Sequence, residues 1–448
     1  MVLSSPKMRF LSLGFGAALL FVCVSSAQDK QGAGAAPSGP VRLTLQVALD
    51  LAKKNSTNFQ SVVTDAAVAK EDKNQARDTL LPSVAYNNSA IYTQGNGPGS
   101  PVRFIANNGV HEYTSQGNVH EVLDVATFAQ YRAAAAAASA AKARAEIASR
   151  GLVVTVVQSY YAALAAQKKL DATTFAAQAG DEFFQLTQSL ERGGEVAHAD
   201  VIKAELQAND RRRQLQEAKL AVLNTRLDLS VVIFPNFTDS FELTDDLHSA
   251  VALPALPEVQ QRAARDNPDL RAALATVQQS SNSVVASRAG YLPSLSFDYF
   301  YGIDATRFAT RTDGISNLGS SVIASLNIPV WNWGATQSKV KQAELHKAQA
   351  QRELSLAQRK LLAETQSLYA EAETASNELA NLERSAQLAA ESLRLATLRY
   401  KNGETNILEV VDAQNTALLS DSAFQDGAVR YRVALANLQT LTGELTTP

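Results

Sequence analysis

The chain has 448 residues, of which 41 are Lys or Arg and 44 are Asp or Glu, so its net charge is −3. Only 19% of the residues are charged, and there is no basic excess of the kind that marks a nucleic-acid-binding protein. Periodic apolar segments run along most of the chain, which excludes an intrinsically disordered protein. We therefore predict a folded protein with no nucleic-acid partner.

The N-terminus has the three-part layout of a secretory signal peptide. Lys7 and Arg9 precede an apolar run over residues 10–24, which is too short for a transmembrane helix, and Ala27 ends a stretch of small residues. Cleavage after Ala27 would remove Cys23, the only cysteine, so the exported protein would contain no disulfide. A lipidated N-terminus at Cys23 stays open as the alternative.

Short motifs recur in the same order at a nearly constant distance, which indicates an internal duplication. Leu81-Pro82-Ser83-Val84 recurs 211 residues later as Leu292-Pro293-Ser294-Leu295, and Gly194-Glu195 recurs 209 residues later as Gly403-Glu404. We divide the chain accordingly into a signal peptide at 1–27, a flexible linker at 28–42, a first repeat at 43–235, a connection at 236–257, a second repeat at 258–443 and a C-terminal tail at 444–448.

Each repeat contains a predicted pair of strands with apolar residues at every second position. In chain order, the four strands are expected at residues 84–92, 119–125, 294–301 and 322–330. The third strand places Phe297 and Tyr299 on one face, whereas Glu121 falls on the apolar face of the second. The connecting residues 94–112 and 302–317 are rich in Gly, Asn, Thr and Pro and are predicted to be loops.

The strands have the length of outer-membrane strands, about ten residues. The sequence after residue 27 contains no run of 18 apolar residues, so any insertion into a membrane would use these strands. Four strands cannot close a barrel, because the smallest barrels have about eight. Either several chains share one barrel, or the strands form a soluble sheet that packs on helices.

Heptad spacing predicts two long helical hairpins. From Leu368 to Tyr400 the apolar residues follow one another at alternating steps of four and three, and a similar stripe follows in residues 424–438. Residues 334–400 contain no Pro and no Gly after the first position, and residues 128–190 form a similar segment in which Gly151 and Gly180 are expected to cause irregularities.

The sequence offers no group of residues typical of an enzyme, a cofactor site or a metal site. The five histidines are scattered, and no nucleophile elbow, P-loop or dinucleotide fingerprint is present. Cysteine and methionine occur only within the signal peptide, which argues against a site for soft metals. We predict a protein that is not an enzyme, with no cofactor and no bound metal.

The conspicuous polar residues gather at two predicted turns. They are Arg192, Gly194, Glu195 and Asp200 at the first turn, and Arg399, Gly403, Glu404, Glu409 and Asp412 at the second. Glycine permits a tight turn, and Glu195 or Glu404 at a helix start would be stabilised by the helix dipole. The turns are therefore either purely structural, or a surface where a partner docks at the end of the hairpins.

The sequence resembles the TolC-like outer-membrane efflux proteins over roughly residues 43–443. The resemblance rests first on the duplicated layout and on the Leu-Pro-Ser motif that precedes each strand pair. It rests also on the motif at residues 327–334, which follows the second strand pair, and on the two motifs at residues 399–404 and 410–413 around the second turn. It implies a mainly α fold with a small β part, in which long antiparallel coiled-coil hairpins build a periplasmic α-barrel. It also implies a homotrimer whose chains each give four transmembrane strands to a shared twelve-stranded barrel in the outer-membrane lipid.

The resemblance further implies a passive exit duct, which receives its substrate from an inner-membrane transporter and a periplasmic adaptor protein. In such proteins the adaptor docks at the helical tips, which correspond here to Arg192, Gly194, Glu195, Asp200, Arg399, Gly403, Glu404, Val410 and Asp412. Arg394 stands where some members carry an acidic ring that constricts the pore, and we expect Arg394 or Arg399 to pair with Glu191 or Glu195 on a neighbouring helix.

The cargo stays open at this point. A duct for small molecules, a duct for metal ions and a type I protein-secretion duct all fit the sequence. An alternative from a different class is a coiled-coil scaffold of the cell envelope that transports nothing. Strands of membrane length with an aromatic face favour a duct, because a scaffold has no use for them.

Overall fold

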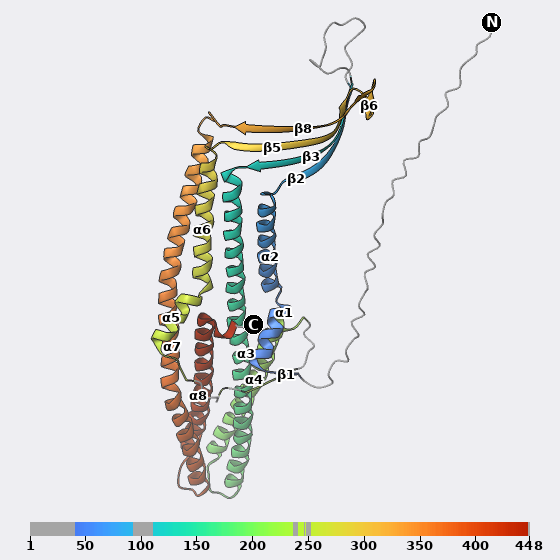
Figure 1. Ribbon diagram of the computed structural model, residues 1–448. Coiled ribbons are helices and arrows are strands. Elements are labelled where there is room, and N and C mark those ends of the chain that lie inside the picture. Colours follow the sequence, from blue (N-terminus) through green and yellow to red (C-terminus); the bar gives the residue numbers. More distant parts are fainter. Residues whose placement is uncertain (1–40, 93–110, 236–240, 246, 248–251, 447–448) are drawn as a thin grey trace, which may run out of the picture.

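The computed structural model describes residues 41–92, 111–235, 241–245, 247 and 252–446. The predicted signal peptide, nearly all of the predicted linker and most of the first predicted loop lie outside these residues. Figure 1 shows a curved sheet at one end of a bundle of long helices, and two helical turns at the opposite end.

The first half of the fold contains three strands and four helices. In chain order, its elements are β1 (Val41–Leu43), α1 (Leu45–Asn55), α2 (Thr57–Asp78), β2 (Ser83–Tyr92), β3 (His111–Leu123), α3 (Val125–Arg192) and α4 (His198–Ile233). The predicted second strand ends too late, because Asp124 caps α3 by accepting a hydrogen bond from the Thr127 amide at 2.5 Å.

The second half repeats the main order of helices and strands. Its elements are β4 (Phe241–Leu243), α5 (Leu256–Asp266), α6 (Pro268–Ala289), β5 (Ser294–Ala305), β6 (Arg311–Thr312), β7 (Ile315–Ser316), β8 (Leu318–Asn327), α7 (Ala335–Lys401), α8 (Ile407–Thr442) and the short 3-10 helix η1 (Glu444–Thr446). The loop predicted from Gly302 is wrong in part, since β5 continues to Ala305 and β6 and β7 form a small hairpin.

The two longest helices, α3 with 68 residues and α7 with 67, confirm the predicted hairpins. At 1.5 Å per residue each spans about 100 Å. The heptad stripe of α7 is confirmed as well, because its positions are buried or half-buried and most of the positions between them are exposed. The fully buried members include Ala372, Ala375, Ala389 and Ala396. The expected irregularities of α3 are absent, since the helix runs through Gly151 and Gly180 without a break.

The main sheet has four antiparallel strands in the order β2-β3-β5-β8. In this sheet β5 of the second half pairs with β3 of the first half, and Phe297 lies opposite Glu121. Both outer strands, β2 and β8, have one free edge. A separate pair joins β1 to β4 in parallel, about 200 residues apart in the chain, with Val41 beside Phe241.

The two faces of the main sheet differ in polarity. From the register, one face collects apolar and aromatic residues of all four strands: Val84, Tyr86, Val119, Leu123, Leu295, Phe297, Tyr299, Tyr301, Val322 and Leu326. The opposite face is mainly polar, although Val122, Phe300 and Ile323 also lie on it. It holds a contact of 2.8 Å between His120 Nδ1 and Asp298 Oδ1. Glu121 does lie on the apolar face, as the sequence predicts, and its Oε2 is buried with no hydrogen-bond partner among the described residues.

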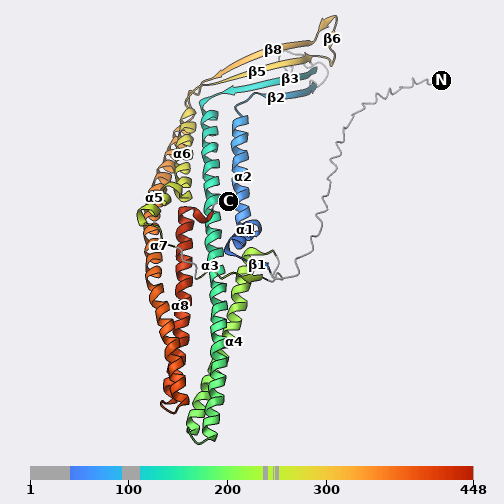
Figure 2. The same cartoon turned by 60° about the horizontal axis from the view of Figure 1, so that its bottom comes forward.

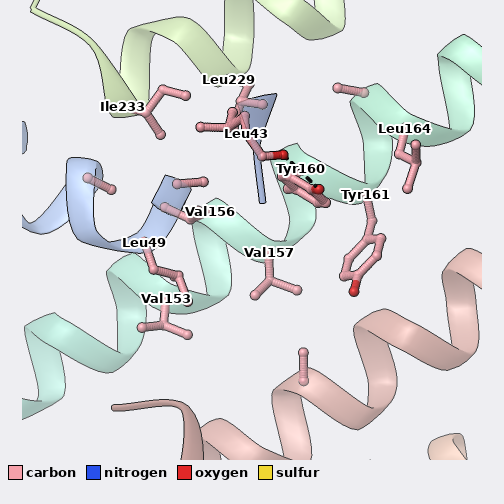
Figure 3. Close-up of a cluster of buried hydrophobic side chains, with 14 of the residues drawn as sticks. Leu43, Leu49, Val153, Val156, Val157, Tyr160, Tyr161, Leu164, Leu229 and Ile233 are labelled. Atoms are coloured by element: carbon pink, nitrogen blue, oxygen red, sulfur yellow. Dashed lines mark hydrogen bonds between the residues drawn. The ribbon is translucent and has the colours of Figure 1, made fainter. Parts of the chain in front are cut away.

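The middle of the bundle is held by an apolar cluster from β1, α1, α3 and α4 (Figure 3). Val153, Val156 and Val157 of α3 are fully buried against Leu49 and the end of α4. The Tyr160 hydroxyl lies 2.7 Å from the Thr244 carbonyl and 3.1 Å from that of Leu43, so it ties the β1–β4 pair to α3.

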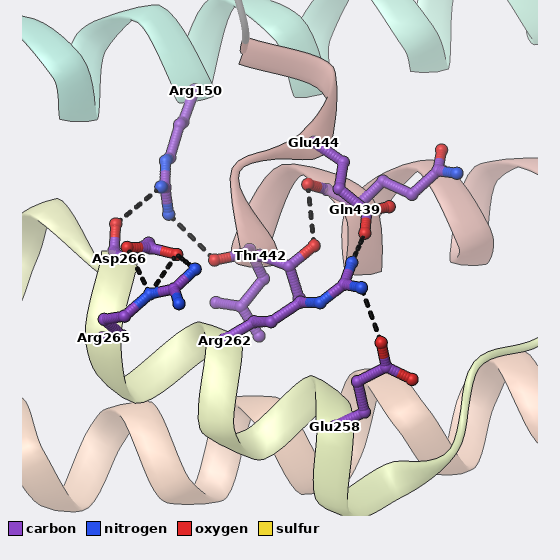
Figure 4. A network of polar contacts seen from close by, with 9 residues as sticks. Arg150, Glu258, Arg262, Arg265, Asp266, Gln439, Thr442 and Glu444 are labelled. Atoms are coloured by element: carbon purple, nitrogen blue, oxygen red, sulfur yellow. Dashed lines mark hydrogen bonds and ion pairs between the residues drawn. The ribbon is translucent and has the colours of Figure 1, made fainter.

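Polar contacts fasten the C-terminal end of α8 beside this cluster (Figure 4). Arg150 donates to the carbonyls of Asp266 and Leu441, at 2.8 and 2.9 Å, so one guanidinium satisfies the ends of both α5 and α8. Burial lowers the pKa of Arg150 below its ordinary value. Arg262 pairs with Glu444, so the predicted tail is attached through η1.

A second apolar cluster joins the four helices at the far end of the bundle. Phe183 of α3 packs against Tyr400 of α7, with ring centroids 5.1 Å apart, and Val410 of α8 is fully buried beside them. Burial raises the pKa of Tyr400, because the phenolate would lose its hydration.

The sheet supplies a first test. A Cβ atom on Gly302 would collide with the backbone carbonyl of Ser115, whereas one on Gly319, its partner in β8, meets open space. We expect Gly302→Ala to lower the free energy of unfolding in detergent by about 1–3 kcal/mol, and Gly319→Ala to leave it within about 0.5 kcal/mol. Equal effects of the two substitutions in denaturant titrations would contradict the close contact between Gly302 and the Ser115 carbonyl.

Tyr400 supplies a second test. A raised pKa in the folded state means that Tyr400 contributes fully to stability below its unfolded value of about 10, and that this contribution is lost as the pH rises through the folded value. Tyr400→Phe keeps the ring but cannot ionise. We expect thermal unfolding midpoints between pH 8 and pH 11 to fall less in Tyr400→Phe than in the wild type. Tyr369→Phe, on the same helix but less buried, serves as the control and should match the wild type.

Candidate functional site

The two helical turns at the far end of the bundle have the same backbone design. In the first turn the amides of Gly194 and Glu195 donate to the carbonyls of Glu191 and Leu190, at 2.8 and 2.9 Å. This is the Schellman pattern, which needs a left-handed residue that glycine supplies best, and Gly194 has a φ of +77°.

The second turn repeats this pattern. Gly403 has a φ of +73°, and the amides of Gly403 and Glu404 donate to the carbonyls of Tyr400 and Arg399, at 3.0 and 2.9 Å. Both predicted glycines are therefore required by the backbone. The expectation that Glu195 and Glu404 stand at helix starts is wrong, because each closes the preceding helix. The acids in the first turns of α4 and α8 are Asp200 and Glu409.

A polar contact across each turn closes the hairpin. In the first turn His198 Nδ1 lies 2.7 Å from Glu191 Oε1. In the second, Arg399 donates to Glu409 at 2.5 Å, and the Thr405 hydroxyl donates to the same carboxylate. Exposed pairs of this kind contribute about 1 kcal/mol or less, so they orient the turns more than they stabilise them.

The structure brings most of the predicted tip residues to one surface. Residues with exposed side chains or exposed backbone are Arg192, Gly194, Glu195, Arg399, Gly403, Glu404 and Asp412, while Asp200 is half-buried. Val410 differs, because it is fully buried in the tip cluster with Phe183 and Tyr400. It supports the second turn from inside and offers no surface to a partner.

A groove of about 860 Å³ runs between the two hairpins above the turns. Its apolar wall includes Phe175 of α3 and Leu393 of α7, and its polar wall includes Arg211 and Arg394. Arg211 is buried, which lowers its pKa, and it donates to Asn415 at 2.5 Å and to Gln214 at 2.9 Å. This buried cation holds α4 to α8 at the back of the groove.

Arg394 does not pair as expected. Within the chain, its guanidinium binds Glu391 of the same helix at 2.8 Å, and this hydrogen bond raises its pKa. Arg399 pairs with Glu409, and Glu191 pairs with His198. The prediction that Arg394 or Arg399 pairs with Glu191 or Glu195 is therefore wrong inside one chain. Arg394 and Glu391 are three residues apart on one helix, a spacing at which side chains are neighbours, and this favours the local partner.

The described residues contain neither a membrane-spanning helix nor a cluster of metal ligands. None of their helices is both long enough and apolar enough to cross a membrane. Nor do these residues include a group of three His, Cys, Asp or Glu side chains placed to hold a metal ion.

Known proteins are similar to this chain in sequence or in fold. Proteases secretion protein PrtF of Dickeya chrysanthemi is 23% identical over 423 residues, covering 89% of this chain and 87% of that protein. Cobalt-zinc-cadmium resistance protein CzcC of Cupriavidus metallidurans is 24% identical, covering 91% of this chain and 92% of that one. The CmeC outer membrane channel of Campylobacter jejuni has the same fold, with a TM-score of 0.76, 20% identity, and coverage of 89% of this chain and 85% of that one.

The family model described as outer membrane efflux protein matches residues 48–233 and again residues 259–444. These segments include both strand pairs and both helical hairpins of the structure. The match extends over most of the chain and agrees with the resemblance drawn from its motifs. The chain therefore belongs to the outer membrane efflux protein family, and it is located in the outer membrane.

Proposed function

We propose that this protein is the outer-membrane exit duct of a tripartite export system. In this role it passively conducts substrate that a periplasmic adaptor and an inner-membrane transporter deliver. The observation that carries the proposal is the four-stranded sheet, which has an apolar face, a polar face and two free edges. Lipid outside and water inside would match these two faces.

Closure of the barrel requires further copies of the chain. Neighbouring strands in the sheet are antiparallel, so β2 and β8 run in opposite directions, and β8 of one copy can pair with β2 of the next in the same antiparallel sense. Two copies would give eight strands, whose interior is filled by side chains. Three copies, the homotrimer that the resemblance implies, give twelve strands and leave room for a channel.

We infer that residues 43–235 and 258–443 are two copies of one structural unit. The pairs α1 and α5, α2 and α6, and α4 and α8 have equal lengths of 11, 22 and 36 residues. One unit alone would contribute a single strand pair. The duplication doubles the strands per chain and places two hairpin tips side by side.

The helical part then extends into the periplasm, and its tips meet the adaptor. Arg192, Gly194, Glu195, Asp200, Arg399, Gly403, Glu404 and Asp412 form the proposed docking surface, with Val410 supporting it from within. Acidic and basic side chains are interspersed on this surface, which suits a partner helix with polar side chains. Arg394, in the polar wall of the groove, is the proposed constriction residue.

The cargo of the duct follows from its partners. PrtF is named for protease secretion and CzcC for resistance to metal ions, although both match nearly the whole chain at similar identity. The shared architecture therefore serves cargoes of very different size. Small-molecule efflux is the leading assignment, and the similarity to PrtF supports type I protein secretion as the alternative. A scaffold without transport leaves the apolar sheet face unexplained.

Conductance tests the proposal directly. The purified protein, with its mass in detergent determined, should behave as a trimer and produce discrete single-channel currents in a planar bilayer. The same recording on Arg394→Glu should change ion selectivity if this residue lines the constriction, because three charges reverse in a trimer. A monomer or dimer that never inserts would contradict the duct and favour a scaffold.

Photocrosslinking in cells tests the docking surface. A photoreactive residue placed at Glu404 should crosslink to the adaptor, identified by mass spectrometry. The same residue at Arg265, an exposed position on α5, should not. Arg399→Glu, which opposes Glu409 with a like charge, should lower the yield from position 404 several-fold without loss of conductance. Equal yields from positions 404 and 265 would place the adaptor elsewhere.

A further inference from the structure

The second helical turn contains an Asn-Gly pair, Asn402 and Gly403. It is the one such pair among the described residues, because the pairs at 96–97 and 108–109 lie outside them. Figures 1 and 2 both place this turn, between α7 and α8, at the end of the bundle that is far from the sheet. Asn402 is exposed there, so a side-chain amide that is chemically labile lies at the proposed docking surface.

An Asn-Gly pair can modify itself in water. The backbone nitrogen of Gly403 attacks the side-chain carbonyl carbon of Asn402, and the new carbon–nitrogen bond closes a cyclic imide. The side-chain nitrogen leaves as ammonia and takes up the proton that the Gly403 nitrogen loses. Water then opens the imide at either carbonyl, which gives aspartate or isoaspartate at position 402. Glycine favours the attack, because it has no Cβ atom to shield its nitrogen and adopts conformations that other residues avoid.

The backbone does not require an asparagine at this position. Position 402 corresponds to Gly193 of the first turn, because the two turns are 209 residues apart. Gly193 has a φ of −77° and a ψ of −8°, and Asn402 has a φ of −90° and a ψ of 1°. Both values are those of a type I turn, which most residues can adopt. The two turns therefore share one shape, and the reactive pair occurs in the second alone.

The second turn holds the two reacting groups apart. At a ψ of 1° the Gly403 nitrogen eclipses the backbone nitrogen of Asn402 and is rotated away from the Asn402 side chain. Ring closure needs a rotation into a sparsely populated part of backbone space. It also breaks the hydrogen bonds from the amides of Gly403 and Glu404 to the carbonyls of Tyr400 and Arg399, at 3.0 and 2.9 Å. The turn must therefore open before Asn402 can react.

A polar contact across the turn keeps it closed. Arg399 of α7 donates to Glu409 of α8 at 2.5 Å, and the Thr405 hydroxyl donates to the same carboxylate. This contact joins the last turn of α7 to the first turn of α8, so its loss would let the residues between them open more often. The rate of reaction at position 402 thus depends on how firmly the second turn is closed.

The products would disturb the same turn. Asn402 is the C-cap of α7, where the helix dipole disfavours a negative charge. A carboxylate at this position also lies three residues from Arg399 and would compete with Glu409 for its guanidinium. Isoaspartate places an extra methylene group in the main chain, so the hydrogen bonds of the turn could not all form. Modification would therefore open the turn that had restrained it.

We propose that Asn402 is a site of spontaneous deamidation, that the closed second turn holds the reaction back, and that the reaction alters the proposed docking surface. The reactive site concerns the chain alone. Its effect on the adaptor rests on the proposed function.

Peptide mapping by mass spectrometry measures the reaction in the full-length oligomer in detergent at mildly alkaline pH. We expect position 402 to convert several-fold more slowly in the folded protein than in the same protein unfolded in denaturant. Glu409→Gln should raise the rate in the folded protein several-fold, because it weakens the contact with Arg399. Glu391→Gln is the matched control, since it weakens a similar exposed pair on α7, with Arg394, and should leave the rate unchanged.

Three results would overturn the proposal. Equal rates in the folded and the unfolded protein would mean that the turn does not hold the reaction back. No conversion in the unfolded protein would mean that position 402 is not reactive. An unchanged rate in Glu409→Gln, or an equal rise in both variants, would mean that the contact across the turn is not the restraint.

Two matched variants test the effect on docking. Asn402→Asp places the product charge at the end of α7, whereas Asn406→Asp makes the same change at the N-cap of α8, where an acid is as favourable as asparagine. In the photocrosslinking experiment, Asn402→Asp should lower the yield from position 404 several-fold, and Asn406→Asp should leave it unchanged.

The two parts of the proposal can fail separately. Equal crosslinking yields from Asn402→Asp and Asn406→Asp would refute the effect on docking. If position 404 does not crosslink even in the wild type, the proposed docking surface and the effect on it are refuted together. The rates measured on the purified protein decide the reactive site in either case.

Discussion

The unpaired backbone of two strand edges is the constraint on which the rest of this structure depends. Along β2 and β8 the outward edge faces no other strand among the described residues, and hydrocarbon offers its amide and carbonyl groups no partner. A sheet with an apolar face therefore cannot enter a membrane as a single copy. Because β2 and β8 run in opposite directions, the free edge of β8 in one copy can pair with the free edge of β2 in the next copy.

The helical part solves a different problem, which is to keep two long hairpins together across about 100 Å with little apolar surface. Alanines spaced along α3 and α7 allow close helix packing and bury only small side chains. Larger residues are concentrated in the cluster around Tyr160 at mid-length and the cluster around Tyr400 at the tips. The bundle thus buries most of its large apolar side chains at two levels.

The two tips combine a common backbone with different surfaces. Both turns use a left-handed glycine and the same hydrogen bonds, so their shape follows from the duplication. Their closing contacts differ, because the first pairs His198 with Glu191 and the second pairs Arg399 with Glu409. A partner that docks across both tips would therefore meet two turns with the same backbone shape but with different charged side chains.

The sequence by itself determined the features that depend on neighbours along the chain. The heptad stripe of α7, the glycines of both turns, the alternation in β5 and the duplicated order can all be read from local spacing, because helix and strand periods are properties of short segments. The ends of β3 and β8 were predicted less well, since the cap at Asp124 and the missing amide of Pro329 decide them.

Only the tertiary structure decided which distant segments meet. It placed β3 beside β5 and β1 beside β4, buried Val410 among predicted surface residues, and gave Arg394 a partner on its own helix. It also revealed that Gly302 faces a carbonyl of another strand. These facts depend on contacts between residues far apart in the chain, and local spacing carries no information about such contacts.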